Sequence, residues 1–263
     1  MSLIKVNQEK CKKDGICSFV CVAKIIRKPT DDRYPEIKPE YAQGCIACGH
    51  CVAACPAGAL DHEYAPLSQC FPIPDDFRLE PDAVETLLRS RRSIRNYLEK
   101  PVPRELLDRL LDAGRYAPTG ANLQNVRYVV CDDPAKVREF AGMVINMMRE
   151  RSPLESESLI AAWDAGQDPI LRGAPAFIVA YGEPGFTTHG VLAMSYIDLM
   201  AFALDLGACF GGYFTTAINS DPNLKQKLGI PRELAAAATL MIGYPRFKYQ
   251  RVPPRKAAKA KWV

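Results

Sequence analysis

The four cysteines of residues 45–56 constrain this chain more than any other feature. The segment reads C-I-A-C-G-H-C-V-A-A-C-P, with gaps of two, two and three residues and a final proline. At this spacing thiolates hold a [4Fe–4S] cluster, and the fourth binds a second cluster where two are present. Zinc is the alternative, but its ligands usually come as two separated pairs, and disulfides would need an oxidising compartment. The spacing therefore predicts iron–sulfur ligation by Cys45, Cys48, Cys51 and Cys55.

A related segment precedes this one. Residues 11–21 read C-K-K-D-G-I-C-S-F-V-C, which is C-x2-D-x2-C-x3-C. Its four positions that correspond to the later cysteines are Cys11, Asp14, Cys17 and Cys21. Over about residues 1–62, the pair of segments resembles a two-cluster bacterial ferredoxin. The crossed pattern of that family implies one cluster on Cys45, Cys48, Cys51 and Cys21, and another on Cys11, Cys17 and Cys55.

Asp14 would face the fourth iron of the second cluster. A carboxylate is a harder ligand than a thiolate and holds iron less firmly. We therefore expect either a [4Fe–4S] cluster with an aspartate ligand or a [3Fe–4S] cluster, beside one ordinary [4Fe–4S] cluster. The alternative is that Asp14 is only a turn residue before Gly15.

Composition divides the chain and narrows its class. Most of the ten cysteines precede residue 71, and residues 64–77 contain three prolines without a clear period. We predict a ferredoxin domain over 1–64, a linker over 65–77 and a second domain over 78–263. No signal peptide is expected at residues 1–5, and no apolar run is long enough to span a membrane. The net charge is +4, with seven basic residues in 246–261, but prolines interrupt this tail and nucleic-acid binding is not expected.

Two motifs mark the second domain. Residues 91–97 read R-R-S-I-R-N-Y after a helix predicted over 81–90, and guanidinium groups of this kind can clamp a phosphate. A second helix, predicted from Pro103 with leucines on one face, ends in A-P-T-G-A-N-L-Q-N at 117–125. The small and amide side chains of this loop suit hydrogen bonding to a planar polar ligand. A buried strand is predicted over 126–131.

Together the two motifs resemble the FMN-dependent nitroreductase family, over roughly residues 79–255. The resemblance implies a homodimeric α+β domain with a central mixed sheet and with FMN in the subunit interface. It implies that the FMN phosphate and the pyrimidine edge of the flavin are bound by Arg91, Arg92, Ser93 and Arg95. From the partner subunit, the implied contacts are Pro118, Thr119, Gly120, Asn122 and Gln124. Many relatives have Pro-Trp after the glutamine, whereas this chain has Asn125-Val126.

The remainder of the domain is predicted as alternating helices and strands. Helices are expected over 137–149 and 191–206, the second at the centre of the dimer, and strands over 174–181 and 237–244; residues 154–166 are ambiguous. The methionines of the first helix pack in the core or form a soft pocket wall. Gly211 and Gly212 match the family's glycine-rich segment beside the flavin, where backbone N–H groups could support the reduced ring; a tight turn is the alternative. Arg251 aligns with the family's late basic residue at the FMN phosphate.

The sequence thus predicts a cytoplasmic oxidoreductase that passes electrons from iron–sulfur clusters to FMN and on to a small electrophile such as a nitroaromatic, a quinone or an activated alkene. No side chain is expected to act as a nucleophile, because flavin N5 would deliver the hydride. The external donor would be a reduced ferredoxin-type protein or NAD(P)H. The alternative is an electron carrier or redox sensor without a substrate of its own. The three histidines show no ligand spacing and are expected to be structural or on the surface.

Overall fold

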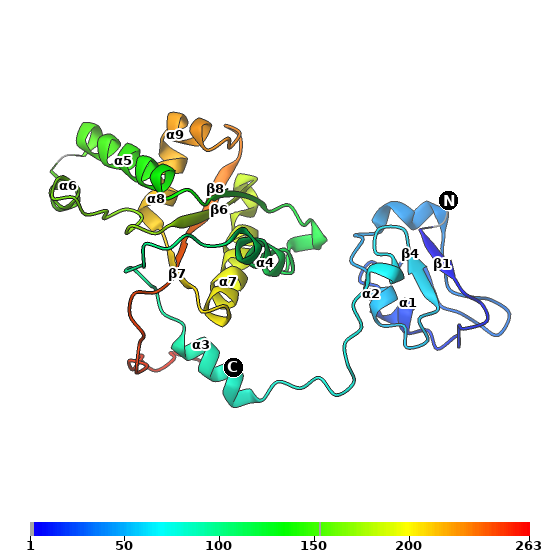
Figure 1. The fold of residues 1–263 in the computed structure, drawn as a ribbon. Helices are drawn as coiled ribbons and strands as arrows, with labels where there is room; N and C mark the ends of the chain where they lie inside the picture. Colours follow the sequence, from blue (N-terminus) through cyan, green and yellow to red (C-terminus); the bar gives the residue numbers. More distant parts are fainter. Residues whose placement is uncertain (1–2, 153) are drawn as a thin grey trace. The chain divides into compact units, whose positions relative to one another are not determined.

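The computed structural model describes residues 3–152 and 154–263, so Met1, Ser2 and Pro153 lie outside it, and with them the start of the segment in which no signal peptide is expected. The chain divides into two compact units (Figure 1). Unit 1 comprises Met1–Arg78 with Thr119–Leu123, and unit 2 comprises Leu79–Pro118 with Gln124–Val263. Within the described residues, no helix has the length and apolar character needed to cross a membrane.

Unit 1 is built from short elements around the cysteine segments. Strand β1 (Ile4–Val6) pairs antiparallel with β4 (Leu60–His62), and β2 (Ile26–Arg27) pairs with β3 (Glu36–Ile37). The second pair is also antiparallel and lies between the two cysteine segments. The helical elements are α1 (Ile16–Val20), η1 (Pro39–Gly44), α2 (His50–Ala53), η2 (Leu67–Gln69) and η3 (Gly120–Asn122).

The two cysteine segments of unit 1 share an unusual backbone. Gly15 before α1 and Gly49 before α2 are both left-handed, with φ of 77° and 70°. Two residues earlier, Lys13 and Ala47 are left-handed as well, at 55° and 51°. Residues with side chains seldom adopt this conformation, so its recurrence at matching positions is informative. The two segments thus share one local backbone conformation. In this alignment Asp14 occupies the position that corresponds to Cys48.

Unit 2 is an α+β domain around a four-stranded sheet of order β5-β6-β8-β7, which confirms the predicted class. The strands are β5 (Arg127–Cys131), β6 (Ala176–Gly182), β7 (Gly207–Phe210) and β8 (Ala235–Gly243). All their pairings are antiparallel; the parallel component is a single bridge between Ser93 and Ala208. The helices are α3 (Pro81–Ser90), α4 (Arg104–Arg115), α5 (Pro134–Arg151), α6 (Glu157–Asp164), η4 (Pro184–Phe186), α7 (Thr187–Ala203), α8 (Gly212–Ser220) and α9 (Pro222–Lys227).

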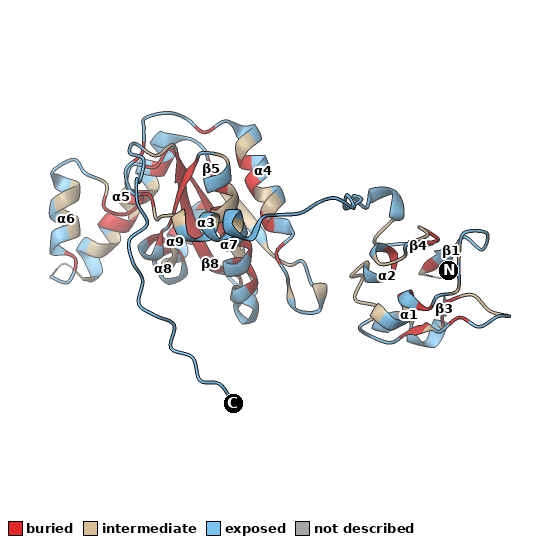
Figure 2. Ribbon diagram, turned by 90° about the horizontal axis from the view of Figure 1, so that it is seen from below, coloured by how far each residue is buried: buried red, intermediate tan, exposed pale blue. Residues whose placement is uncertain are grey.

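Both faces of this sheet are covered, as the buried strands in Figure 2 show. Side chains alternate between the two faces of a strand, so Phe177 packs with α5 and α8 whereas Ile178 packs with α4 and α7. The predicted leucine face of α4 is confirmed, since Leu107 and Leu110 are buried. Strand β5, expected to be buried, is mostly half-buried because it lies at the edge of the sheet.

Several boundaries differ from expectation. Helix α7 begins at Thr187 and ends at Ala203, earlier at both ends than predicted, and Asp205 beyond it is left-handed with φ of 56°. The ambiguous residues 154–166 contain α6. Cys70, in the predicted linker, is exposed.

Candidate functional site

Unit 1 holds two small cavities, each lined by four of the predicted ligand residues. One is lined by Cys21, Cys45, Cys48 and Cys51. The other is lined by Cys11, Asp14, Cys17 and Cys55. The structure therefore brings together the two sets that the crossed ferredoxin pattern implies. Cysteine thiolates dominate both sets, and thiolates are the usual ligands of iron–sulfur clusters.

The cysteines of these cavities are free thiols, and two of them are buried. Burial raises the pKa of Cys51 to about 11 and also raises the pKa of Cys17. A buried thiolate is therefore unfavourable unless a cation lies beside it. Iron would provide that positive charge, so the burial of these thiols fits the predicted clusters.

His62 contributes to the first cavity, although its sequence context gave no indication of this. The ring is 3% exposed and its Nε2 lies 3.3 Å from Cys45 Sγ. The backbone N–H of Tyr64 donates to His62 Nδ1 at 3.0 Å. Burial lowers the pKa of His62 below its ordinary value, which favours the neutral imidazole.

Unit 2 holds a cavity of about 580 Å³ at the end of β7. This volume lies within the range typical of sites for small molecules. Arg95 meets the glycine-rich segment there because residues 93–94 run beside β7, where Ile94 N–H donates to Ala208 O at 2.9 Å. The lining residues are Arg95, Met147, Met148, Pro169, Ile170, Arg172, Cys209, Phe210, Gly211, Gly212, Tyr213, Thr216, Ala217 and Met241.

Gly211 and Gly212 form the junction of β7 with α8. Gly211 N–H already donates to Thr239 O at 2.9 Å. A Cβ added to Gly212 would meet no atom within 4 Å, so neither backbone strain nor protein packing requires a glycine there. The absence of a side chain leaves open space in the cavity, which suits close approach of a ligand to the start of α8.

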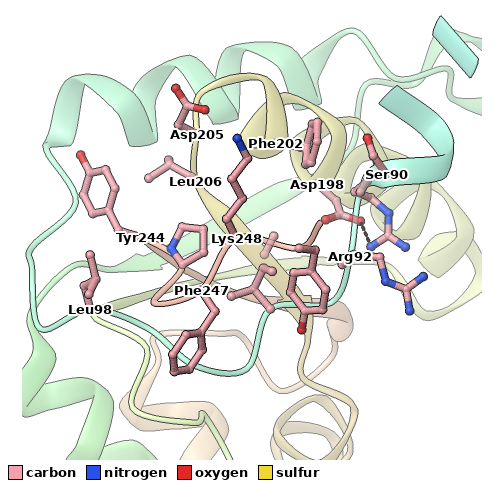
Figure 3. Close-up of a pocket in the computed structure, with 15 residues that line it drawn as sticks. Ser90, Arg92, Leu98, Asp198, Phe202, Asp205, Leu206, Tyr244, Phe247 and Lys248 are labelled. Carbon is pink, nitrogen blue, oxygen red and sulfur yellow. Dashed lines mark ion pairs between the residues drawn. The ribbon is translucent and has the colours of Figure 1, made fainter. Parts of the chain in front are cut away.

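Arg91 and Arg92 line a second cavity of unit 2, of about 450 Å³. Figure 3 shows Arg92 in this cavity with Asp198. Arg91 Nη1 lies 3.0 Å from Asp198 Oδ2, and the Asp198 residue is 6% exposed. Asp198 Oδ1 has no hydrogen-bond partner among the described residues. Burial raises the pKa of Asp198, whereas Arg91 opposes that rise. The predicted basic cluster is thus divided, with Arg91 and Arg92 in one cavity and Arg95 in the other.

Asp198 is a residue that the sequence did not indicate, because it stands alone in an apolar helix. Lys248 lines the same cavity as Asp198, on the segment that follows β8 (Figure 3). Arg251, predicted at the FMN phosphate, is exposed and lines neither cavity of unit 2. Met147 and Met148 satisfy both of their predicted roles, since they pack against the core and also line the cavity of Arg95.

The amide-rich loop is divided between the units. Pro118 and Gln124 belong to unit 2, whereas residues 119–123 belong to unit 1. Asn122 Nδ2 donates to Ile46 O at 3.2 Å and to Ala47 O at 3.0 Å, beside the first cysteines of the later segment. Ala121, Asn122 and Gln124 are all left-handed, a strained conformation for residues with side chains. Thr119 and Gly120 of the predicted FMN loop lie in the same unit as Asn122.

Comparisons with known proteins agree with both resemblances. Residues 88–244 match the model of the nitroreductase family, and residues 9–60 match that of a 4Fe-4S dicluster domain. Iodotyrosine deiodinase 1 of Rattus norvegicus is 28% identical over 187 residues, which are 65% of this chain and 65% of that protein. An NADH dehydrogenase of Thermus thermophilus is 30% identical over 177 residues, 61% of this chain and 86% of that protein.

Solved structures show the same fold for unit 2. An FMN-bound nitroreductase from Bacteroides fragilis matches with a TM-score of 0.58 and 20% identity, covering 68% of this chain and 96% of that one. One from Desulfitobacterium hafniense, also with bound FMN, matches with 0.58 and 21%, covering 68% and 97%. Since the family match spans more than half of the residues, the chain belongs to the nitroreductase family and carries a 4Fe-4S dicluster domain ahead of its nitroreductase part.

Proposed function

We propose that this protein passes electrons from two iron–sulfur clusters in unit 1 to FMN in unit 2, and from there to a small electrophilic substrate. The observation that carries the proposal is the presence, in one chain, of two cysteine-lined cavities and a cavity of about 580 Å³ at the glycine-rich end of β7. Clusters carry single electrons, whereas a flavin can accept one and deliver two, so the two kinds of group complement each other. A nitroaromatic, a quinone or an activated alkene would suit such a site.

In unit 1, Cys21, Cys45, Cys48 and Cys51 would bind a [4Fe–4S] cluster. Cys11, Cys17 and Cys55 would bind the second cluster, either as [4Fe–4S] with Asp14 as a ligand or as [3Fe–4S]. The matched left-handed backbone at Lys13 and Ala47, and again at Gly15 and Gly49, supports the equivalence of Asp14 with Cys48. The dicluster family match supports two clusters.

In unit 2, the cavity of Arg95 would hold the flavin ring, and the bound FMN of the two structural neighbours supports this ligand. The guanidinium of Arg95 would face the pyrimidine edge, and the backbone near Gly211 and Gly212 would support negative charge on the reduced ring. Met147 and Met148 would provide a soft apolar wall.

The phosphate of FMN would be bound by Ser93, Arg92 and Arg91, with Asp198 orienting Arg91. Pro118 and Gln124, on either side of the divided loop, stay proposed FMN contacts, as does Arg251.

Two features favour an enzyme over an electron carrier without a substrate. Phe210 and Tyr213 line the flavin cavity and are 41% and 54% exposed, so the cavity is accessible from solvent. The names of the relatives, an NADH dehydrogenase and iodotyrosine deiodinases, describe reactions on small molecules. The name NADH dehydrogenase also supports NAD(P)H as a donor alternative to a reduced ferredoxin-type protein.

The protein would act as a homodimer. Helix α7 exposes Val191, Leu192, Tyr196 and Phe202, although it is apolar overall. A helix that is hydrophobic all round is normally buried on all sides, so a second copy would cover these side chains. The reduced thiols fit a reducing compartment, and we place the protein in the cytoplasm as part of the proposal.

Anaerobic steady-state assays would test the proposal. The protein would be mixed with a nitroaromatic and, in separate reactions, with reduced ferredoxin, NADH or NADPH. Turnover with any of these donors supports the enzyme, and turnover with reduced ferredoxin supports entry of electrons through the clusters. Flavin that is reduced but never reoxidised by a nitroaromatic, a quinone or an activated alkene would favour the electron carrier or redox sensor instead.

A further inference from the structure

His62 distinguishes the two cysteine-lined cavities. It occupies the last position of β4, opposite Ile4, and it is almost completely buried. Its ring lines the cavity of Cys21, Cys45, Cys48 and Cys51, with Nε2 at 3.3 Å from Cys45 Sγ. This distance lies within hydrogen-bonding range for a sulfur acceptor.

The other ring nitrogen determines which of the two carries the proton. Tyr64 N–H donates to Nδ1 at 3.0 Å, so Nδ1 accepts and holds no hydrogen. In a neutral imidazole the hydrogen is then on Nε2, which must donate. The turn after β4 therefore directs an N–H group at the sulfur of Cys45.

Among the described residues, the second cavity has no equivalent of His62. Cys55 Sγ accepts a backbone hydrogen bond from Ala59 N–H at 3.3 Å. Of the residues that the structure describes, no histidine lines the cavity of Cys11, Asp14, Cys17 and Cys55. The two sites thus differ in one buried side-chain donor.

We infer that His62 raises the reduction potential of the cluster bound at Cys21, Cys45, Cys48 and Cys51 by donating a hydrogen bond from Nε2 to Cys45 Sγ. Reduction adds one electron, and with it negative charge, to the cluster and its sulfur ligands. An N–H dipole directed at a ligating sulfur stabilises that charge, and hydrogen bonds to sulfur are an established determinant of cluster potentials. The proton stays on Nε2 throughout. His62 is therefore a positioning residue, and its role rests on the proposed binding of the cluster.

Redox titration of the full-length protein, followed by electron paramagnetic resonance, would test the inference. His62→Phe keeps a ring in the space but removes the donor. We expect a more negative midpoint potential for one cluster only. At a fixed potential, the ratio of reduced to oxidised cluster should be roughly tenfold smaller, which corresponds to a shift of about 59 mV for one electron. His62→Gln retains a donor and should lie between the two. His50→Phe, which removes the exposed histidine beside Cys51, is the matched control and should leave the midpoint unchanged.

A second measurement is made on the wild type and does not depend on the folding of the His62 variants. With histidine as the only ¹⁵N-labelled residue type, the reduced wild-type cluster should show hyperfine coupling to an imidazole nitrogen, and His50→Phe should retain it. The inference on His62 would be overturned by an unchanged midpoint potential in a His62→Phe protein with full cluster content, or by the absence of this coupling in the wild type. Neither result would contradict the proposed function. A wild type without any cluster signal after anaerobic reconstitution would overturn the proposed function as well.

Discussion

At the scale of single residues, Asp14 is the position where the two cysteine segments differ most. It lines the second cavity, and its Oδ1 accepts a hydrogen bond from Ile16 N–H at 3.0 Å. This contact is the turn role that the sequence left open as the alternative. It uses one carboxylate oxygen, so Asp14 can serve the turn and still present the other oxygen to iron.

The variant Asp14→Cys separates these roles. A thiolate binds iron more strongly than a carboxylate, so this variant should hold a stable four-iron cluster at Cys11, Cys17 and Cys55. Paramagnetic spectra recorded after mild oxidation should show a three-iron signal in the wild type and much less of it in the variant. Identical spectra would mean that Asp14 does not lie near a labile iron.

Asp198 gives a prediction on pH. Its pKa is raised by burial, so between the ordinary carboxyl pKa and the raised value the folded protein binds more protons than the unfolded chain. The free energy of unfolding should therefore fall as pH rises through this window, and Asp198→Asn should not show this fall. Denaturant unfolding followed by the fluorescence of Trp163 would measure it. Asp205→Asn, which removes an exposed carboxylate from the same cavity, is the control, and an equal pH dependence in wild type and Asp198→Asn would contradict the prediction.

At the scale of elements, the junction of β7 and α8 determines how closely a ligand can approach. Gly212→Val should fold normally, because its Cβ meets no protein atom within 4 Å, but it should weaken FMN binding by tenfold or more by filling that space. Fluorescence titration with FMN would give the dissociation constants. Gly185→Val, at another glycine with open space around it, should bind FMN like the wild type. Equal affinities for all three proteins would place the flavin elsewhere.

Elements with strong local signals could be predicted from the sequence. Helix α3 has the predicted bounds because Pro81 and Asp82 mark its first turn. The leucine period located α4, and the resemblance to two-cluster ferredoxins implied the sets that the two small cavities bring together. Helix α7 was harder, because it is apolar on all sides and has no capping side chain at either end.

Contacts between distant segments could not be predicted. The ion pair of Arg91 with Asp198 joins residues more than a hundred positions apart, and the contact of His62 with Cys45 depends on how β4 pairs with β1. The same holds for Asn122. Its side-chain amide donates hydrogen bonds to the carbonyl oxygens of residues 46 and 47, and local sequence preferences do not predict such contacts. In each case, tertiary packing determines which residue the side chain contacts, and the neighbouring sequence does not indicate that contact.

At the scale of the whole molecule, the proposal predicts cofactor content. Protein purified without oxygen should carry FMN and two iron–sulfur clusters per chain, because unit 1 has two sets of proposed ligand residues and unit 2 has one cavity at the glycine-rich junction. Chemical analysis of flavin, iron and acid-labile sulfide would measure this. Iron and sulfide sufficient for only one cluster after anaerobic reconstitution would contradict the two-cluster assignment.

The central claim is that electrons reach the flavin through the clusters. Cys48→Ser should damage the cluster at Cys21, Cys45, Cys48 and Cys51 but leave FMN bound, because Arg95 and the glycine-rich junction belong to unit 2. After reduction by dithionite, the FMN of this variant should still reduce substrate. Arg95→Ala should show the converse result, in which FMN is lost and both clusters are retained. The decisive measurement is stopped-flow reduction of the flavin by reduced ferredoxin. We predict that it is abolished or greatly slowed in Cys48→Ser; flavin reduction at the wild-type rate would show that the clusters are not on the path.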